Sequence, residues 1–207
     1  MKSKIALREF TLSVLDLPIA SHQFLVLKDE QGKIISQAHG IAVNNNNEFQ
    51  SVSFGGEDRL KAVIYPPREN HSTLSAKSFT GLVQPGQEEK TLREGSREEM
   101  EKLWDGCILN GAETFNLLNV RYNPFGGELS NIREGNSNSI ARTFCDILGI
   151  PHCNISGRLL PGTAKNLLPQ EKFKHVYVSN LSSSEVSVAG ACAALNPSSL
   201  DTLLDLD

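Results

Sequence analysis

The feature that most constrains the fold is a close series of short apolar segments in the first third of this 207-residue chain. Polar or proline-containing turns separate these segments, which is the pattern of consecutive strands. Strands spaced so closely predict an antiparallel sheet. The segments are FTLSVLDL (10–17), HQFLVLKD (22–29), GKIISQAHGIAV (32–43) and LKAVIYPP (60–67).

Two histidines fall on the second and third of these segments, which we expect to form a hairpin around KDEQG (28–32). A turn centred on Glu30 and Gln31 gives paired residues whose numbers sum to 61, so His22 would lie opposite His39. The register therefore predicts that both imidazoles belong to one site. The alternative is that each is a partly buried histidine of the sheet with no chemical role.

The middle of the chain changes to helical spacing. Ser96 is followed three residues later by Glu99, which is the spacing of a capping box. We expect a helix from this point to about Gly111, with Trp104 facing the core. The residues at helical intervals are Met100, Leu103, Trp104 and Cys107.

A second helix is predicted in REGNSNSIARTFCDILG (133–149). Its apolar residues fit one helical face, Gly149 is suited to the position after the last turn, and Pro151 follows. Together with the sheet, these helices predict an α+β fold in a single domain of residues 1–207, with an antiparallel sheet packed against helices. The apolar face consists of Ile140, Phe144, Ile147 and Leu148.

The serines at the start of this helix have two interpretations. Ser137 or Ser139 can act as an N-cap that accepts backbone N–H groups of the first turn. The same position favours a nucleophile, because unpaired N–H groups at a helix start attract an anion and can stabilise an oxyanion. A serine nucleophile also needs a neighbouring base, which the two sheet histidines could supply.

The remaining histidines and the cysteines offer weaker candidates. His71 stands in a polar segment and is expected to be exposed, whereas His152 and His175 adjoin apolar segments and are expected to be structural. The cysteines have neither C-x-x-C nor metal-ligand spacing, so we expect free thiols in a reducing compartment and no metal site. A hydrolase that uses Cys153 with His152 or His175 is an alternative. The four cysteines are Cys107, Cys145, Cys153 and Cys192.

Charge and hydropathy exclude several classes of protein. The formal net charge is −4 and the basic residues are scattered, so we expect no nucleic-acid partner. No segment approaches the roughly 18 to 20 apolar residues of a membrane-spanning helix, so we expect no integral membrane insertion. Arg8 and Glu9 interrupt the first apolar stretch, so we expect no signal peptide and synthesis in the cytoplasm. We expect no cofactor.

The hairpin SHQFLVLKDEQGKIISQAHG (21–40) and the helix start NSNSIARTFCDILG (136–149) resemble the circularly permuted papain-like hydrolases, the NlpC-type and lecithin retinol acyltransferase-like group. In that group a histidine strand precedes a cysteine nucleophile, which stands in an Asn-Cys motif, often NCNSF, at a helix start. By this resemblance Ser137 takes the place of the cysteine, His22 that of the general base, and His39 that of the residue that orients the base. Asn136 and Asn138 flank the nucleophile, and backbone N–H groups around Ser137 and Asn138 would stabilise the oxyanion.

The resemblance implies acyl transfer to water at an amide or ester bond. Peptidoglycan peptides are the commonest substrate it implies, and lipid acyl groups come second. A bacterial antibacterial effector without a signal peptide would leave by a dedicated machine such as type VI secretion, act in a target cell envelope, and be paired with an immunity protein.

Serine in place of cysteine leaves three explanations: a true serine variant, an inactive relative, or a substitution that disables a cysteine enzyme. A non-catalytic binding module of the same fold, in which Ser137 is only an N-cap, is the chief alternative to an enzyme.

Overall fold

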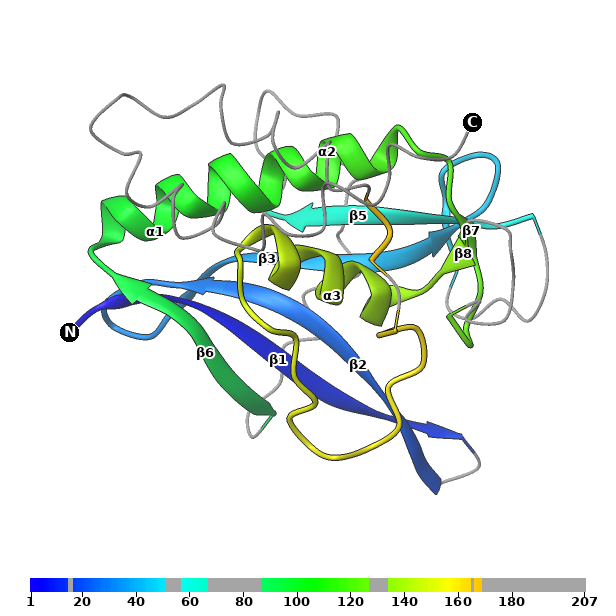
Figure 1. Cartoon of the computed structure of the whole chain (residues 1–207), viewed down its shortest axis with the longest axis horizontal. Coiled ribbons are helices and arrows are strands. Elements are labelled where there is room, and N and C mark those ends of the chain that lie inside the picture. The colour runs from blue at the N-terminus through cyan, green and yellow to red at the C-terminus, as the bar shows by residue number, and fades with distance from the viewer. Residues whose placement is uncertain (15–16, 51–56, 67–86, 127–133, 165, 169–207) are drawn as a thin grey trace, which may run out of the picture.

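A curled, mostly antiparallel β-sheet is the framework of the fold (Figure 1). The computed structural model describes residues 1–14, 17–50, 57–66, 87–126, 134–164 and 166–168. Within these ranges the sheet order is β6-β1-β2-β3-β5-β7-β8, with β4 paired to β3, and only β7 and β8 run parallel. The predicted α+β class and antiparallel sheet are confirmed. The strands are β1 (Ser3–Val14), β2 (Leu17–Lys28), β3 (Ile34–Val43), β4 (Phe49–Gln50), β5 (Arg59–Tyr65), β6 (Glu88–Gly95), β7 (Arg121–Tyr122) and β8 (Glu134–Gly135).

The first strand begins earlier than the sequence indicates. β1 starts at Ser3, whereas the prediction placed a strand from Phe10 to Leu17. Ile5 and Leu7 are fully buried in the core. The charged residues on either side of this segment do not interrupt the strand. The predicted strand in fact spans the connection between β1 and β2.

The β2–β3 hairpin is confirmed, but its register differs from the predicted one. Paired residues sum to 63 from Leu25↔Ala38 to Leu27↔Ser36, and the register shifts at Lys28. The side chain of Asp29 accepts hydrogen bonds from the backbone of Gln31 and Lys33, and the connection spans residues 29–33, one residue later than expected. A slip of two residues leaves every side chain on its original face, because side chains alternate with period two.

A long helix crosses one face of the sheet. It consists of α1 (Arg97–Leu103), a π-helical segment (Trp104–Leu109) and α2 (Asn110–Asn116). The capping box of Ser96 and Glu99 and the buried position of Trp104 are confirmed. The predicted end near Gly111 is wrong, because the helix continues to Asn116.

Among the described residues, no helix has the length and apolar character needed to cross a membrane.

Gly111 lies within the helix because another helix packs against it. A Cβ atom there would lie 2.7 Å from Cδ1 of Ile147, which belongs to α3 (Ser137–Ile147). The glycine therefore permits close approach of the two helices.

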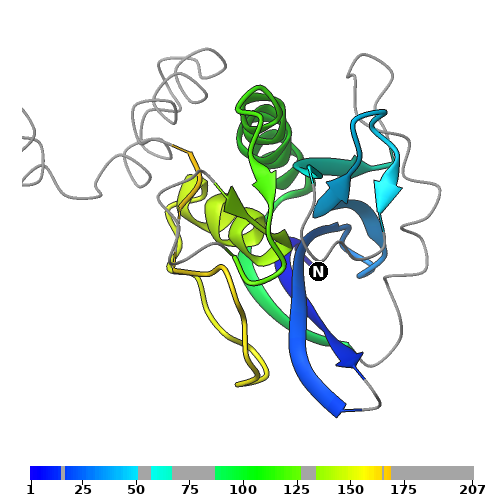
Figure 2. The same ribbon diagram turned by 90° about the vertical axis from the view of Figure 1, so that its right-hand side faces the viewer.

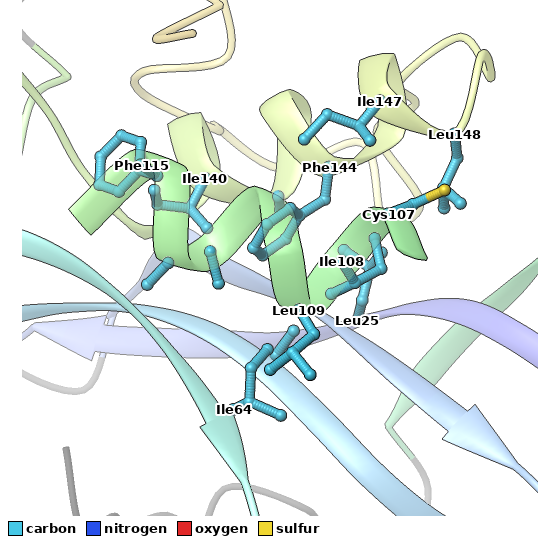
Figure 3. Close-up of a cluster of buried hydrophobic side chains, with 14 of the residues drawn as sticks. Leu25, Ile64, Cys107, Ile108, Leu109, Phe115, Ile140, Phe144, Ile147 and Leu148 are labelled. Atoms are coloured by element: carbon cyan, nitrogen blue, oxygen red, sulfur yellow. The ribbon is translucent and has the colours of Figure 1, made fainter. Parts of the chain in front are cut away.

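The helix α3 lies beside the long helix, and both face one core (Figures 2 and 3). Its predicted apolar face is confirmed, and Gly149 adopts a positive φ of 65° just beyond its end. The side chains of both helices point toward one another and toward the strands (Figure 3). The labelled members of this core are Leu25, Ile64, Cys107, Ile108, Leu109, Phe115, Ile140, Phe144, Ile147 and Leu148.

The two faces of the sheet carry different side chains of the same strand. Leu25 and Leu27 of β2 pack in the core beneath the helices. Phe24 and Val26 point to the other face, where they form a separate apolar cluster with Ala6. By the same alternation, His22 lies on the Phe24 face.

Candidate functional site

The start of α3 is bonded to the backbone on both sides of His22. Asn138 Oδ1 accepts a hydrogen bond from the Gln23 N–H at 2.8 Å, and Asn138 Nδ2 donates to the Ser21 carbonyl at 2.9 Å. The described pairing of β2 with β3 stops at Leu25↔Ala38. The Asn138 amide thus bonds backbone groups of β2 beyond the last of these pairs, and the start of α3 meets the sheet where β2 and β3 part.

The N-cap of α3 is Asn136, not a serine. Its Oδ1 accepts from the backbone N–H groups of Asn138 and Ser139 at 3.0 and 3.1 Å. Ser139 completes a capping box by accepting from the Asn136 N–H at 3.2 Å, and its hydroxyl donates to the Gly162 carbonyl at 2.8 Å. The expectation that Ser137 or Ser139 is the N-cap is therefore wrong, because the amide of Asn136 already satisfies the first turn.

Ser137 is the residue of this turn that the cap does not use. In the part of the chain that the structure describes, neither its hydroxyl nor its backbone N–H has a hydrogen-bond partner. A Cβ atom on Gly40 would lie 2.7 Å from the Ser137 Cα, so glycine is required for this close approach. The expected oxyanion donor at Asn138 is also corrected: that N–H is bonded to Asn136, and the N–H of Ser137 itself is the one left over.

The two predicted histidines do meet, and a glutamine extends them into a chain. His22 Nε2 lies 3.5 Å from His39 Nδ1, which is long for a hydrogen bond. His39 Nε2 lies 2.9 Å from Gln37 Oε1. The prediction placed His22 directly opposite His39. In the structure it is the ring of Phe24 that stacks on His39, with ring centroids 4.4 Å apart. The two histidines are therefore diagonal neighbours on one face, still within reach of each other.

Aromatic side chains surround this histidine pair. The ring of Phe10 lies 4.8 Å from that of His22, measured between centroids. Burial among these groups lowers the pKa of His22 to about 4. Burial, together with the nearby His22, lowers the pKa of His39 well below its usual value. Both imidazoles are therefore neutral at pH 7, and a neutral imidazole can accept a proton.

Ser137 and the histidines lie on different faces of the sheet. Ser137 comes from the helix face, where it packs on Gly40, and the histidines lie on the opposite face. In the described ranges no hydrogen bond joins the Ser137 hydroxyl to either imidazole. Ser137 and His22 are both buried, each 8% exposed, and His39 is fully buried.

The other candidate groups have structural surroundings. His152 Nε2 lies 2.5 Å from Gln23 Oε1, and Gln23 also donates to the Cys153 carbonyl and to Glu9. Burial lowers the pKa of His152 to about 4. This network ties the segment after α3 to the sheet.

Three of the four cysteines lie within the described residues. Cys107 is buried in the core, Cys145 and Cys153 are free thiols, and burial raises the pKa of Cys145 to about 12, which makes it a poor nucleophile. His71, His175 and Cys192 lie outside the described residues.

Sequence reasoning missed Gln37 and the role of Asn138. Gln37 had a detectable signal, because it stands two residues before His39 and must share its face in a strand. The bond from Asn138 to β2 joins residues 115 positions apart, and no local pattern indicates it.

Comparisons with protein-family models, curated proteins and solved structures find no match for this chain. Within the described ranges, no group of three or more His, Cys, Asp or Glu side chains is placed to hold a metal ion.

Proposed function

We propose that this protein is a hydrolase of amide or ester bonds with a permuted papain-like arrangement, in which Ser137 is the nucleophile and His22 the general base. The observation that carries the proposal is that Asn138 bonds both backbone groups flanking His22. Because Ser137 directly precedes Asn138, this bond supports a site in which Ser137 and His22 meet where the pairing of β2 with β3 ends. His39 is the residue that orients the base.

The mechanism follows from the groups that remain unbonded. His22 accepts the hydroxyl proton of Ser137 as Oγ attacks the carbonyl carbon of the substrate, and the Ser137 N–H stabilises the resulting oxyanion. The intermediate collapses, and the leaving amine or alcohol takes the proton from His22. Water, deprotonated by His22, then cleaves the acyl-serine ester and regenerates Ser137.

The base is weak, which limits the rate. A histidine with a pKa near 4 is fully deprotonated at neutral pH, but it draws a proton from serine less strongly than one poised near 7. Substrate binding has to bring the Ser137 hydroxyl into hydrogen-bond range of His22, because active-site bonds are often long in the unliganded protein.

The substrate class we propose is the peptide part of bacterial peptidoglycan, with lipid acyl groups as the second choice. The protein would then be an antibacterial effector that a dedicated machine such as type VI secretion delivers to a neighbouring cell envelope, and an immunity protein would protect the producer. The resemblance of the hairpin and the NSNS turn to permuted papain-like hydrolases supports this proposal.

Growth of a bacterial host tests the substrate and its compartment. The chain is directed to the periplasm or kept in the cytoplasm, and compared with His22→Ala, Ser137→Ala and Ser137→Cys. We expect toxicity only in the periplasm, loss of toxicity in His22→Ala and Ser137→Ala, and retention in Ser137→Cys. Equal growth of all strains in both compartments contradicts an envelope substrate, and toxicity of Ser137→Cys alone identifies a disabled cysteine enzyme.

A second candidate is a non-catalytic binding module of the same fold. The absence of a hydrogen bond between Ser137 and His22 in the described structure favours it. Under this alternative, Ser137→Ala leaves every function intact.

A further inference from the structure

Gln37 is buried at the end of the histidine chain and contacts its innermost member. Its side chain is 6% exposed, and its Oε1 lies 2.9 Å from His39 Nε2. Gln37 and His39 share one face of β3 because they are two residues apart. The chain therefore runs from Gln37 through His39 to His22.

The amide oxygen of Gln37 decides where the protons of both rings reside. An oxygen can only accept, so His39 must carry its proton on Nε2 and present a lone pair at Nδ1. That lone pair lies 3.5 Å from His22 Nε2, a long contact that is favourable only when this nitrogen carries the proton of the second ring. His22 Nδ1 is left unprotonated.

Reversal of the amide would disable the same site. With the NH₂ group of Gln37 toward His39, the proton of His39 would move to Nδ1 and point at His22 Nε2. The proton of His22 would then sit on Nδ1, and this nitrogen could not accept a proton from Ser137. The orientation of the Gln37 amide thus determines whether Nδ1 of His22 can accept a proton.

We propose that Gln37 is a positioning residue which, through His39, holds His22 in the Nε2–H tautomer and leaves Nδ1 as the basic nitrogen. This inference rests on the proposed function for its catalytic meaning, but the tautomers can be measured without any substrate. Gln37 contacts His39, which contacts His22, so Gln37 itself touches no reacting atom.

Two-bond ¹H–¹⁵N correlation spectra of the full chain, labelled with ¹⁵N-histidine, measure the tautomers directly at pH 7. In the wild-type protein we expect both His22 and His39 as Nε2–H. Gln37→Glu keeps an acceptor oxygen and should keep both tautomers, whereas Gln37→Met should raise the Nδ1–H fraction of His39. Gln50→Met on the neighbouring strand β4 is the matched control and should change neither ring.

An Nδ1–H tautomer of His39 or His22 in the wild-type protein overturns the inference, and so does a Gln37→Met spectrum identical to wild type. If Gln37→Met does not fold, the wild-type and Gln37→Glu spectra still decide. The rate at which a fluorophosphonate probe modifies Ser137 gives the catalytic readout: Gln37→Met should lower it roughly 10- to 100-fold, with recovery in Gln37→Glu. An unreactive wild-type Ser137 with the expected tautomers contradicts the proposed function and leaves the role of Gln37 in place.

Discussion

The starts of α1 and α3 use the same capping device in opposite surroundings. At α1, Ser96 and Glu99 form a capping box at the surface, and the first helical residue, Arg97, pairs with Glu101 one turn later. At α3, Asn136 and Ser139 form the corresponding box inside the protein.

The difference lies in what α3 has beyond its cap. Capping needs only the N-cap and the third residue, as α1 demonstrates. The start of α3 adds the bonds from Asn138 to β2 and from Ser139 to the Gly162 carbonyl, and it buries a serine at the position where α1 has an exposed arginine. These additions are unnecessary for a helix start, and they tie the residue after Ser137 to the backbone on both sides of His22. Four predictions test this comparison.

Asn138→Ala should be the most destabilising change. It leaves the Gln23 N–H and the Ser21 carbonyl buried without their partner, which we expect to lower the free energy of unfolding by about 3 to 4 kcal/mol. Asn138→Asp should not recover this loss, because its carboxylate would be buried against the Ser21 carbonyl to which Asn138 donates. Urea denaturation measures both, and a loss below about 1 kcal/mol would mean that α3 does not depend on this contact.

As the pH falls, the stability contribution of buried His22 should be lost before that of Glu99 at the start of α1. An unfolded histidine takes up a proton near pH 6.5, whereas folded His22 stays neutral down to about pH 4, so the contribution of His22 is present above pH 6.5 and is lost as the pH falls toward 4. The expected loss is roughly 3 kcal/mol. Hydrogen bonds from Ser96 lower the pKa of Glu99, so its contribution disappears only below the usual carboxylate range.

Denaturant curves at pH 7, 5.5 and 4 measure this loss, with His22→Phe as the control that removes the titrating group. Parallel losses in the wild type and His22→Phe would show that another group is responsible.

Removal of the two N-caps should lower the free energy of unfolding by amounts that differ about twofold. Ser96→Ala removes one exposed cap and should cost about 1 kcal/mol. Asn136→Ala should cost about 2 kcal/mol, because Asn136 also donates to the carbonyls of Pro124 and Pro161. Thermal unfolding of both variants tests the order, and equal costs would remove the distinction between the two starts.

Ser137→Ala should have the smallest effect on stability. Its hydroxyl has no partner among the described residues, so the free energy of unfolding should change by less than about 0.5 kcal/mol. Calorimetry of Ser137→Ala and of Arg97→Ala, the same position in α1, provides the matched pair. A loss above 1 kcal/mol in Ser137→Ala would mean that the serine is a structural group.

The sequence predicts the local features of this fold well. The β2–β3 hairpin, β5, the Ser96 capping box and the apolar face of α3 follow from spacing alone, because each depends on neighbours within a few residues, whereas the first strand was misplaced and β6 was not predicted. The end of the long helix was wrong because Gly111 is held inside it by packing against Ile147, which no local pattern contains.

The site was predictable only in part. The pairing of His22 with His39 follows from the hairpin, and the error of two residues in register changed nothing about their shared face. The cap was assigned wrongly because Asn136, Ser137 and Ser139 are all able to cap, and only the folded backbone selects one. The contact of Asn138 with β2 required the tertiary structure.

The most direct test of the account is the reactivity of Ser137 toward a fluorophosphonate probe, read by mass spectrometry of the modified peptide. We expect modification of Ser137 at pH 7 that is lost in His22→Ala and spares the other serines of the same turn. An unmodified Ser137, or modification at an equal rate in His22→Ala, would contradict the claim that His22 activates this serine.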